Sequence, residues 1–142
     1  MASKIKRIAI CTGGGDAPGL NAVIRAVTLA AHNRDWEVYG IRDGYNGLLM
    51  PEQYMEGGLV PLTPERVMGI TSLGGTIIGT TNQGNPLHYP IKGFDGQITE
   101  IDRSDELLRA FQLHQIEPSL AGFAGRMKVD DDEIVWYLER ED

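Results

Sequence analysis

The chain opens with an apolar run, continues with a segment of helical period and then returns to an apolar run. Residues 8–11 are continuously apolar and end in a glycine cluster, which is typical of a short buried strand. From Pro18, which suits a first helical turn, to Ala31, apolar residues recur at helical spacing and form one stripe of Leu20, Val23, Ile24, Val27 and Ala31. Residues 37–41 predict a second strand. Strand, helix and strand in this order predict a βαβ unit with parallel strands and a right-handed crossover.

The later pattern is less regular but still alternates strand and helix signals. Thr63-Pro64-Glu65 indicates a helix start, with a capping residue followed by proline. Residues 72–81 predict a short strand bracketed by glycines. Asp95-Gly96 marks a turn before a hairpin strand at 97–101. Residues 105–115 predict a helix whose apolar contacts are Leu107, Leu108 and Phe111.

Composition narrows the class of protein. A chain of 142 residues is the size of one domain, and its 18 glycines exceed the usual share of about 7%. The net charge of −7 argues against nucleic acid and anionic membrane surfaces as partners, although backbone N–H groups can still bind a phosphate ligand. The lone Cys11 excludes an internal disulfide, and the apolar run at 8–11 is too short for a signal peptide or a membrane span. We therefore expect a soluble, cytoplasmic protein.

The first glycine-rich segment, residues 12–21, lies between the first predicted strand and the first predicted helix. This position, at the carboxyl end of a strand and against a helix N-terminus, is where open α/β sheets bind anionic ligands. The segment is not a P-loop, because no Gly-Lys-Ser/Thr follows, and Pro18 occupies the third glycine position of a dinucleotide fingerprint. The carboxylate of Asp16 would repel a bare phosphate, so it would act through Mg²⁺ or hold loop N–H groups. The alternative is a tight turn without a ligand.

A second glycine-rich segment, residues 74–83, ends in hydrogen-bonding side chains. If its carboxyl end lies beside the first loop, the two segments would form opposite walls of one nucleotide cleft; a glycine-rich edge strand is the alternative. Arg25 is expected on the polar face of the first helix, facing water. The three histidines share no metal-ligand spacing, so no metal site is assigned, and Cys11 is expected to be a small core residue.

Three strings of the sequence resemble the signatures of the phosphofructokinases, in the right order and spacing. They are residues 14–22 (GGDAPGLNA), 39–48 (YGIRDGYNGL) and 74–81 (GGTIIGTT), and residues 85–106 resemble the subgroup of bacterial enzymes of ATP or pyrophosphate type. The resemblance implies a partial doubly wound, Rossmann-like α/β sheet in residues 1–117, followed by a divergent acidic tail in residues 118–142. It also implies a homo-oligomeric enzyme that uses Mg²⁺ and ATP, or pyrophosphate, to phosphorylate fructose 6-phosphate at its 1-hydroxyl.

The resemblance also implies roles for individual residues. The nucleotide would be bound by Gly14, Gly15, Asp16, Asn82 and Gln83. Gln83 departs from the family, which often has an arginine in this pocket. Arg25 matches a position that some bacterial members use for an allosteric phosphate ligand, but Leu29 stands where those members carry a second arginine.

The resemblance weakens at Pro118. A family member would continue into an apolar strand and a Gly-Gly-Asp-Gly-Ser/Thr string, whereas residues 120–125 here lead into Arg126-Met-Lys-Val and acidic residues. The family's aspartate base and the residues that bind the sugar phosphate have no counterpart in this sequence, so no catalytic residue is assigned. We expect a truncated phosphofructokinase that does not turn over alone. A non-catalytic phosphate-binding or interaction module is the main alternative, and the glycine spacing disfavours a nucleotide-dependent oxidoreductase.

Overall fold

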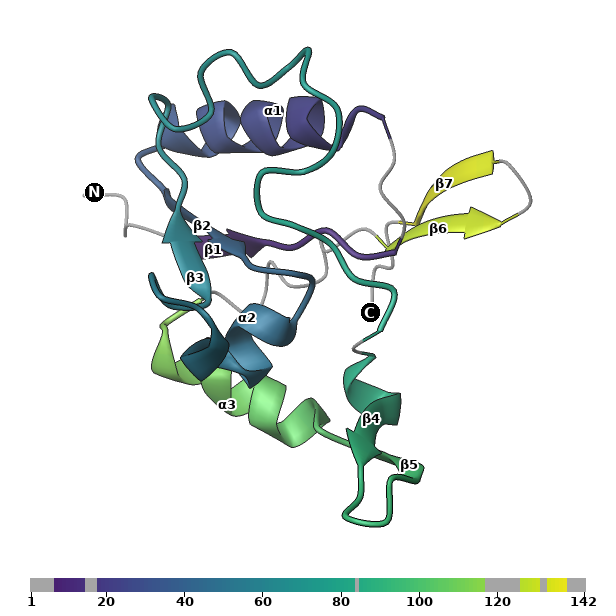
Figure 1. The fold of residues 1–142 in the computed structure, drawn as a ribbon. Coiled ribbons are helices and arrows are strands. Elements are labelled where there is room, and N and C mark those ends of the chain that lie inside the picture. Colours follow the sequence, from purple (N-terminus) through teal and green to yellow (C-terminus); the bar gives the residue numbers. More distant parts are fainter. Residues whose placement is uncertain (1–6, 15–17, 84, 117–125, 131–132, 138–142) are drawn as a thin grey trace.

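The computed structural model describes residues 7–14, 18–83 and 85–116, and the backbone of residues 126–130 and 133–137. A central sheet has the strand order β1-β2-β3 (Figure 1). Its strands are β1 (Arg7–Ile10), β2 (Glu37–Ile41) and β3 (Leu59–Pro61). β1 and β2 are parallel, and helix α1 (Leu20–His32) connects them, so the predicted βαβ unit is confirmed. β3 is antiparallel to β2, which makes the sheet mixed rather than purely parallel.

Helices cover both faces of this sheet, as the doubly wound prediction requires. α1 packs on one face, in a core cluster of Ile24, Ala31, Val38, Leu62, Val67, Ile70 and Ile78. The short α2 (Asn46–Leu49) and α3 (Ser104–Leu113) lie on the other face, in a cluster of Ile41, Leu48, Leu49, Tyr89 and Leu107 (Figure 1). Alternate residues of β2 therefore contribute side chains to two separate core clusters, because successive side chains of a strand point to opposite faces of the sheet.

The buried face of α1 differs from the predicted apolar stripe. Leu20, Ile24 and Ala31 are buried as expected, but the remaining buried positions are Asn21 and Thr28 rather than Val23 and Val27. Both polar side chains have hydrogen-bond partners; the Thr28 hydroxyl donates to the Ile24 carbonyl at 2.8 Å. The helix also begins after Pro18, at a Gly19 N-cap with φ of +95°. A prediction of the buried helix face from hydrophobicity alone misses polar residues that are buried and make hydrogen bonds inside the protein.

Residues 72–81 do not form the predicted strand. Gly75 and Gly79 each have a φ of +77°, a conformation that interrupts an extended segment. The Asn21 amide takes the place of a sheet partner: its nitrogen donates to the carbonyls of Leu73 and Gly74 at 3.1 and 3.3 Å, and its oxygen accepts from Ile77 N at 2.8 Å. The segment is thus an irregular loop held by a helix side chain.

Two further predictions concern short helical segments. The Thr63 hydroxyl accepts from Arg66 N at 3.2 Å, as a helix cap would, but only turns follow before Gly69 with φ of +75°. The predicted helix at 105–115 is confirmed as α3, with Leu107 buried. Leu108 is 56% exposed, so its assignment as a core contact was wrong. Single-turn helices η1 (Pro51–Gln53) and η2 (Pro86–His88) complete the helical elements described.

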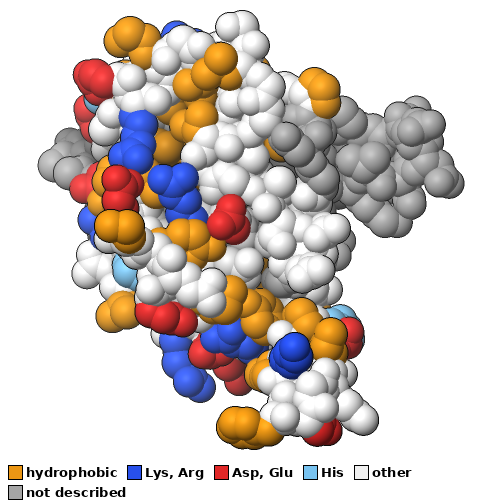
Figure 2. All heavy atoms as spheres, in the orientation of Figure 1, with side chains coloured by type: hydrophobic (Ala, Val, Ile, Leu, Met, Phe, Trp, Pro, Cys, Tyr) orange, Lys and Arg blue, Asp and Glu red, His pale blue; other side chains and the backbone are white. Residues whose placement is uncertain are grey.

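A hairpin of β4 (Tyr89–Lys92) and β5 (Ile98–Ile101) confirms the predicted Asp95-Gly96 turn. Gly96 has φ of +80°, and the Asp95 carboxylate accepts from Gln97 N at 3.0 Å. Tyr89 is the only buried residue of the two strands, while apolar side chains lie exposed on and beside the hairpin at Leu87, Ile91, Phe94, Ile98 and Ile101. Figure 2 shows hydrophobic side chains gathered at this end of the molecule. The hairpin is therefore anchored to the core mainly through Tyr89.

The acidic carboxyl-terminal segment contains a second hairpin that the sequence pattern did not predict. β6 (Arg126–Asp130) pairs antiparallel with β7 (Glu133–Tyr137). Asp131 and Asp132 of the acidic run lie outside the described residues. In the part of the chain that the structure describes, no helix has the length and apolar character needed to cross a membrane.

The hydrogen bonds of Asn21 lead to a prediction about stability. Asn21→Ala would remove the buried amide that bonds Ile77 N–H and the carbonyls of Leu73 and Gly74, and we expect a loss of about 2 kcal/mol in the free energy of unfolding. Asn33→Ala, at the exposed end of the same helix, is the matched control and should change stability by less than about 0.5 kcal/mol. Urea denaturation of both variants measures the difference; equal losses would contradict the assigned role.

Candidate functional site

The first glycine-rich loop leaves the sheet at the carboxyl end of β1 and leads toward the N-terminus of α1. Residues 11–14 of the loop are described, whereas the predicted site residues Gly15 and Asp16 lie outside the described residues. α1 begins at Leu20, its N-cap residue Gly19 has no side chain to cap the first N–H groups, and its first turn contains no acidic residue. Among the described residues, this helix N-terminus therefore favours an anion.

The second glycine-rich segment lies directly against this loop. The Thr12 hydroxyl donates to the Gly79 carbonyl at 2.7 Å and lies 3.0 Å from the Thr76 hydroxyl. Gly14 N donates to the Thr81 carbonyl at 2.9 Å, and the Thr80 hydroxyl donates to the Gly14 carbonyl at 2.9 Å. The two segments are adjacent, as the sequence suggested. Direct hydrogen bonding makes them one continuous wall, however, and not the opposite walls of a cleft.

The backbone geometry at Gly14 determines how a phosphate could bind to the wall formed by residues 12–14 and 74–81. Gly14 has φ of +86°, and no heavy atom lies within 4 Å of the position that a Cβ would occupy there or at Gly13. The backbone is therefore open to close approach by a ligand. Because Gly14 N already donates to Thr81, its own N–H is not free for a phosphate oxygen. The fit to an anion rests on this open backbone and on the N-terminus of α1.

The predicted residues Asn82 and Gln83 continue the wall beyond Thr81, and both are exposed. Thr81 fixes their backbone locally: its hydroxyl donates to the Gln83 carbonyl at 2.7 Å and accepts from Gln83 N at 3.0 Å. The structure thus brings Asn82 and Gln83 to the same edge as Gly14 through the pairing of Gly14 with Thr81. Their role in nucleotide binding remains a prediction.

Asp43 is a residue of this wall that the sequence analysis missed. It follows β2 with φ of +49°, its backbone N donates to the Ile78 carbonyl at 3.0 Å, and its carboxylate accepts from the Tyr54 hydroxyl at 2.9 Å. A Cβ on Gly79 would overlap the Asp43 carboxylate. Asp43 therefore fixes the middle of the second segment from the β2 side. The Asp43-Gly44 dipeptide, a turn signal, was the available clue.

The remaining candidate side chains stand apart from this wall. Arg25 is half-buried on α1, and no hydrogen bond or ion pair of its side chain is recorded with the residues that the structure describes. Its effector role remains a prediction. The histidines are exposed, and His88 lies 3.3 Å from the Glu100 carboxylate. Cys11 is partly buried and packs against the second core cluster, and burial raises the pKa of its thiol, which makes it a poor nucleophile.

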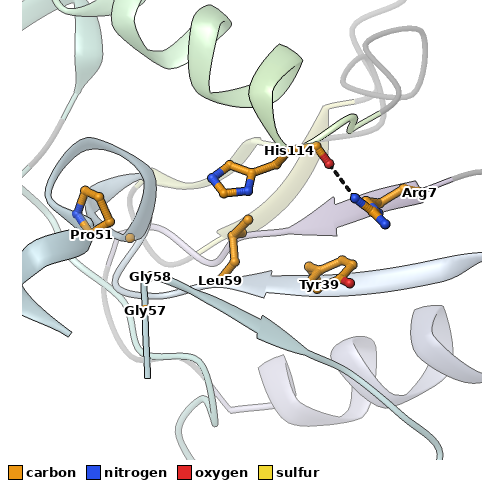
Figure 3. A pocket seen from close by; sticks show the side chains of 8 residues that line it. Arg7, Tyr39, Pro51, Gly57, Gly58, Leu59 and His114 are labelled. Atoms are coloured by element: carbon orange, nitrogen blue, oxygen red, sulfur yellow. Dashed lines mark hydrogen bonds between the residues drawn. The ribbon is translucent and has the colours of Figure 1, made fainter. Parts of the chain in front are cut away.

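A hollow of about 330 Å³ lies along the sheet beside the end of α3 (Figure 3), and its lining extends from Arg7 at the start of β1 to Gly47 and Gly58 next to the carboxyl end of β2. Its lining includes Arg7, the first residue of β1, with Tyr39, Leu59 and His114. The Arg7 guanidinium donates to the Glu37 carboxylate at 2.6 Å and to the His114 carbonyl at 2.8 Å, and it lies 5.2 Å from the centre of the Tyr39 ring. Arg7 thus ties β1 to β2 and α3. The predicted nucleotide site is at the other end of β1.

The sequence of the whole α/β portion matches one family. A family model described as phosphofructokinase matches residues 7–119. The chain is 46% identical over 110 residues to an ATP-dependent 6-phosphofructokinase of Chloroflexus aggregans, an alignment that covers 78% of this chain and 28% of the relative. It is 42% identical over 125 residues to ATP-dependent 6-phosphofructokinase 1 of Nostoc sp., covering 87% of this chain and 32% of the relative. The chain spans about a third of the length of these curated relatives, or less.

Solved structures agree with the sequence matches. The fold is similar to a phosphofructokinase of Pichia pastoris in the T-state, with a TM-score of 0.60 and 33% identity over 80% of this chain and 10% of that chain. It is also similar to a phosphofructokinase of Saccharomyces cerevisiae, with a TM-score of 0.58 and 31% identity over 78% of this chain and 13% of that chain. At these identities the likeness extends beyond the fold to the family.

The contact between Tyr54 and Asp43 predicts a titration. Burial, and then the hydrogen bond to Asp43, raises the pKa of Tyr54 from 10.0 to about 12. Because the folded chain holds this proton more tightly than the unfolded chain, its contribution to stability is present below pH 10 and is lost as the pH rises from about 10 to about 12. The tyrosinate absorbance should show a late component that Tyr54→Phe removes and Tyr39→Phe keeps. Titration of all five tyrosines near pH 10 would contradict the contact.

Proposed function

The chain belongs to the phosphofructokinase family, and we propose that its α/β portion forms the nucleotide side of an ATP-dependent 6-phosphofructokinase, which phosphorylates fructose 6-phosphate in glycolysis. The observation that carries the proposal is the wall in which residues 12–14 and 74–81 are hydrogen-bonded together beside the N-terminus of α1. The names of the relatives support ATP as the phosphoryl donor. A cytoplasmic location and assembly into a homo-oligomer belong to the same proposal.

The wall suits a phosphate ligand for two physical reasons. Glycines at 13 and 14 leave the backbone surface open, so that phosphate oxygens could approach it closely. The α1 N-terminus carries a partial positive charge, its cap residue Gly19 offers no side chain to the first N–H groups, and its first turn contains no acid. In this arrangement Gly15 and the start of α1 would bind the phosphates, which would lie against the open backbone surface at Gly14. Asn82 and Gln83 would line the nucleotide pocket.

Mg²⁺ is part of this proposal because phosphoryl transfer requires neutralisation of the phosphate charge. When bound, the ion would supply that neutralisation between phosphate oxygens. Asp16 is the carboxylate nearest in sequence to the glycines and is the candidate to hold the ion through water or directly. Pyrophosphate would place a similar charge at the same wall, so we retain it as the alternative donor.

The chain alone is proposed to bind without turning over. Activation of a sugar hydroxyl needs a positioned base, and transfer needs cationic groups around the phosphoryl group. The resemblance implies that the family strings which supply these groups lie beyond the matched residues 7–119. The alignment with a named relative covers 28% of that relative, which supports the proposal.

This proposal predicts the outcome of an activity assay. The purified 142-residue chain should produce fructose 1,6-bisphosphate at the no-enzyme background with either ATP or pyrophosphate. A coupled assay measures this, with a full-length phosphofructokinase as positive control. Turnover that follows the protein through successive purification steps would show that the chain holds a complete catalytic site.

Nucleotide binding by the glycine loop is tested by Gly15→Val. A bulky β-branched side chain there would restrict the backbone and occupy the space proposed for phosphate oxygens. Binding of Mg·ATP to the parent chain is expected to be weak, with a Kd of about 1 mM, since much of a family pocket is not in this chain. Amide chemical shifts followed during titration should move at residues 12–14 and 20–22 in the parent and not in the variant.

Thr99→Val provides the control. Thr99 lies exposed on β5, outside the wall, and a strand position accepts a valine side chain. This variant should keep the parental shifts. If the shifts are centred elsewhere, or if Gly15→Val responds as the parent does, the loop is only a turn.

A further inference from the structure

Three charged side chains meet at the carboxyl end of β2, on segments that are distant in sequence. Nη2 of Arg42 and Nη2 of Arg66 both face the same carboxylate oxygen of Glu56, at 3.9 and 3.6 Å. Among the ion pairs of the residues that the structure describes, this carboxylate alone is shared by two guanidinium groups. Two cations that converge on one oxygen mark a position where negative charge is favoured.

The Glu56 carboxylate pairs with these two guanidinium groups without a close hydrogen bond to either of them. Neither distance is within hydrogen-bond range, whereas an arginine and an oxyanion can form two parallel N–H···O bonds at about 2.8 Å. The Glu56 side chain is 72% exposed, and it belongs to a turn with a fully exposed Met55 and with Gly57 at φ of +80°. An exposed ion pair of this kind contributes little to stability, so the carboxylate can leave at low cost.

Arg42, by contrast, is held in place. Its Nη1 donates to the Ile77 carbonyl at 3.0 Å, its backbone N donates to the Gly58 carbonyl at 2.9 Å, and its carbonyl accepts from Gly47 N at 2.8 Å. A guanidinium that is already fixed loses little conformational entropy when it binds an anion. Because Ile77 belongs to the second glycine-rich segment, Arg42 also connects this cluster to the wall described above.

We propose that Arg42 and Arg66 form a binding site for a phosphate group, and that Glu56 is the internal counter-ion which the phosphate displaces. A phosphate dianion offers three or more oxygens in a tetrahedral arrangement, which two guanidinium forks match better than one carboxylate oxygen does. The site uses side-chain cations, whereas the glycine loop uses backbone and a helix N-terminus. It therefore does not depend on nucleotide binding at the loop.

The phosphate can be a free anion or the phosphoryl group of a small molecule, and two titrations distinguish these sources. The 142-residue chain is titrated with inorganic phosphate and, separately, with Mg·ATP, and the Nε–Hε signals of Arg42 and Arg66 are followed together with the amides of residues 56–58. Shifts with inorganic phosphate identify a site for the free anion, and shifts with Mg·ATP alone assign it to a phosphorylated ligand. If neither titrant moves these signals, the proposal is overturned.

Two variants test the roles of the side chains. Arg66→Gln should weaken phosphate binding about tenfold, since Arg66 is exposed and its side chain has no recorded partner other than Glu56 among the described residues. Glu56→Gln should strengthen binding about fivefold by removing the competing carboxylate. Arg109→Gln and Glu52→Gln change the net charge equally at other exposed positions and should leave the affinity within about twofold. Equal effects of Arg66→Gln and Arg109→Gln, or weaker binding after Glu56→Gln, would overturn the proposal.

Discussion

The structure depends on one buried amide. Asn21 is 2% exposed, and it satisfies two carbonyls and one N–H of a segment more than 50 residues away in the chain. A parallel sheet would normally meet these backbone groups with a neighbouring strand. Here the segment at 73–81 pairs with no strand of the described residues, and Asn21 supplies the hydrogen bonds that hold it against α1. Because the same segment bonds Thr12 and Gly14, the placement of the first glycine loop also depends on this contact.

The local elements could be predicted because the signals that specify them are local. The βαβ unit follows from hydrophobic period, the β4–β5 turn from Asp95-Gly96, and α3 from its spacing and first-turn acids. The failed strand at 72–81 has the opposite cause. Its apolar pair, Ile77 and Ile78, resembles a strand core, but the conformation is decided by positive φ at Gly75 and Gly79 and by hydrogen bonds to Asn21 and Thr12. No pattern within the segment contains that long-range information.

In the candidate site too, the sequence predicted some features, whereas others depend on tertiary contacts. The sequence placed Gly14 and Asn82 in one site, and the structure brings their segments together through the bond from Gly14 to Thr81. The sequence could not show that the Gly14 N–H is already occupied by its hydrogen bond to the Thr81 carbonyl. This bond changes how a phosphate would be held. Asp43 was missed because its role depends on Gly79 and Tyr54, each reached only by folding. Residue type and spacing identify which segments form a site, whereas the hydrogen-bond donors left free depend on tertiary contacts.

Charge distribution explains how a chain of net charge −7 can present surfaces for phosphate. Several arginines are used within the fold: Arg7 donates to the His114 carbonyl, Arg42 to Ile77 and Arg103 to Leu49, and Arg103 also lies 4.6 Å from the centre of the Tyr89 ring. Each joins segments that are not neighbours in sequence. Phosphate attraction must then come from short-range sources, because the net field of the chain opposes it. A helix N-terminus beside open glycines is one such source, and a fixed guanidinium whose counter-ion is exposed is a second. Both act within a few ångströms, at distances over which salt screens little.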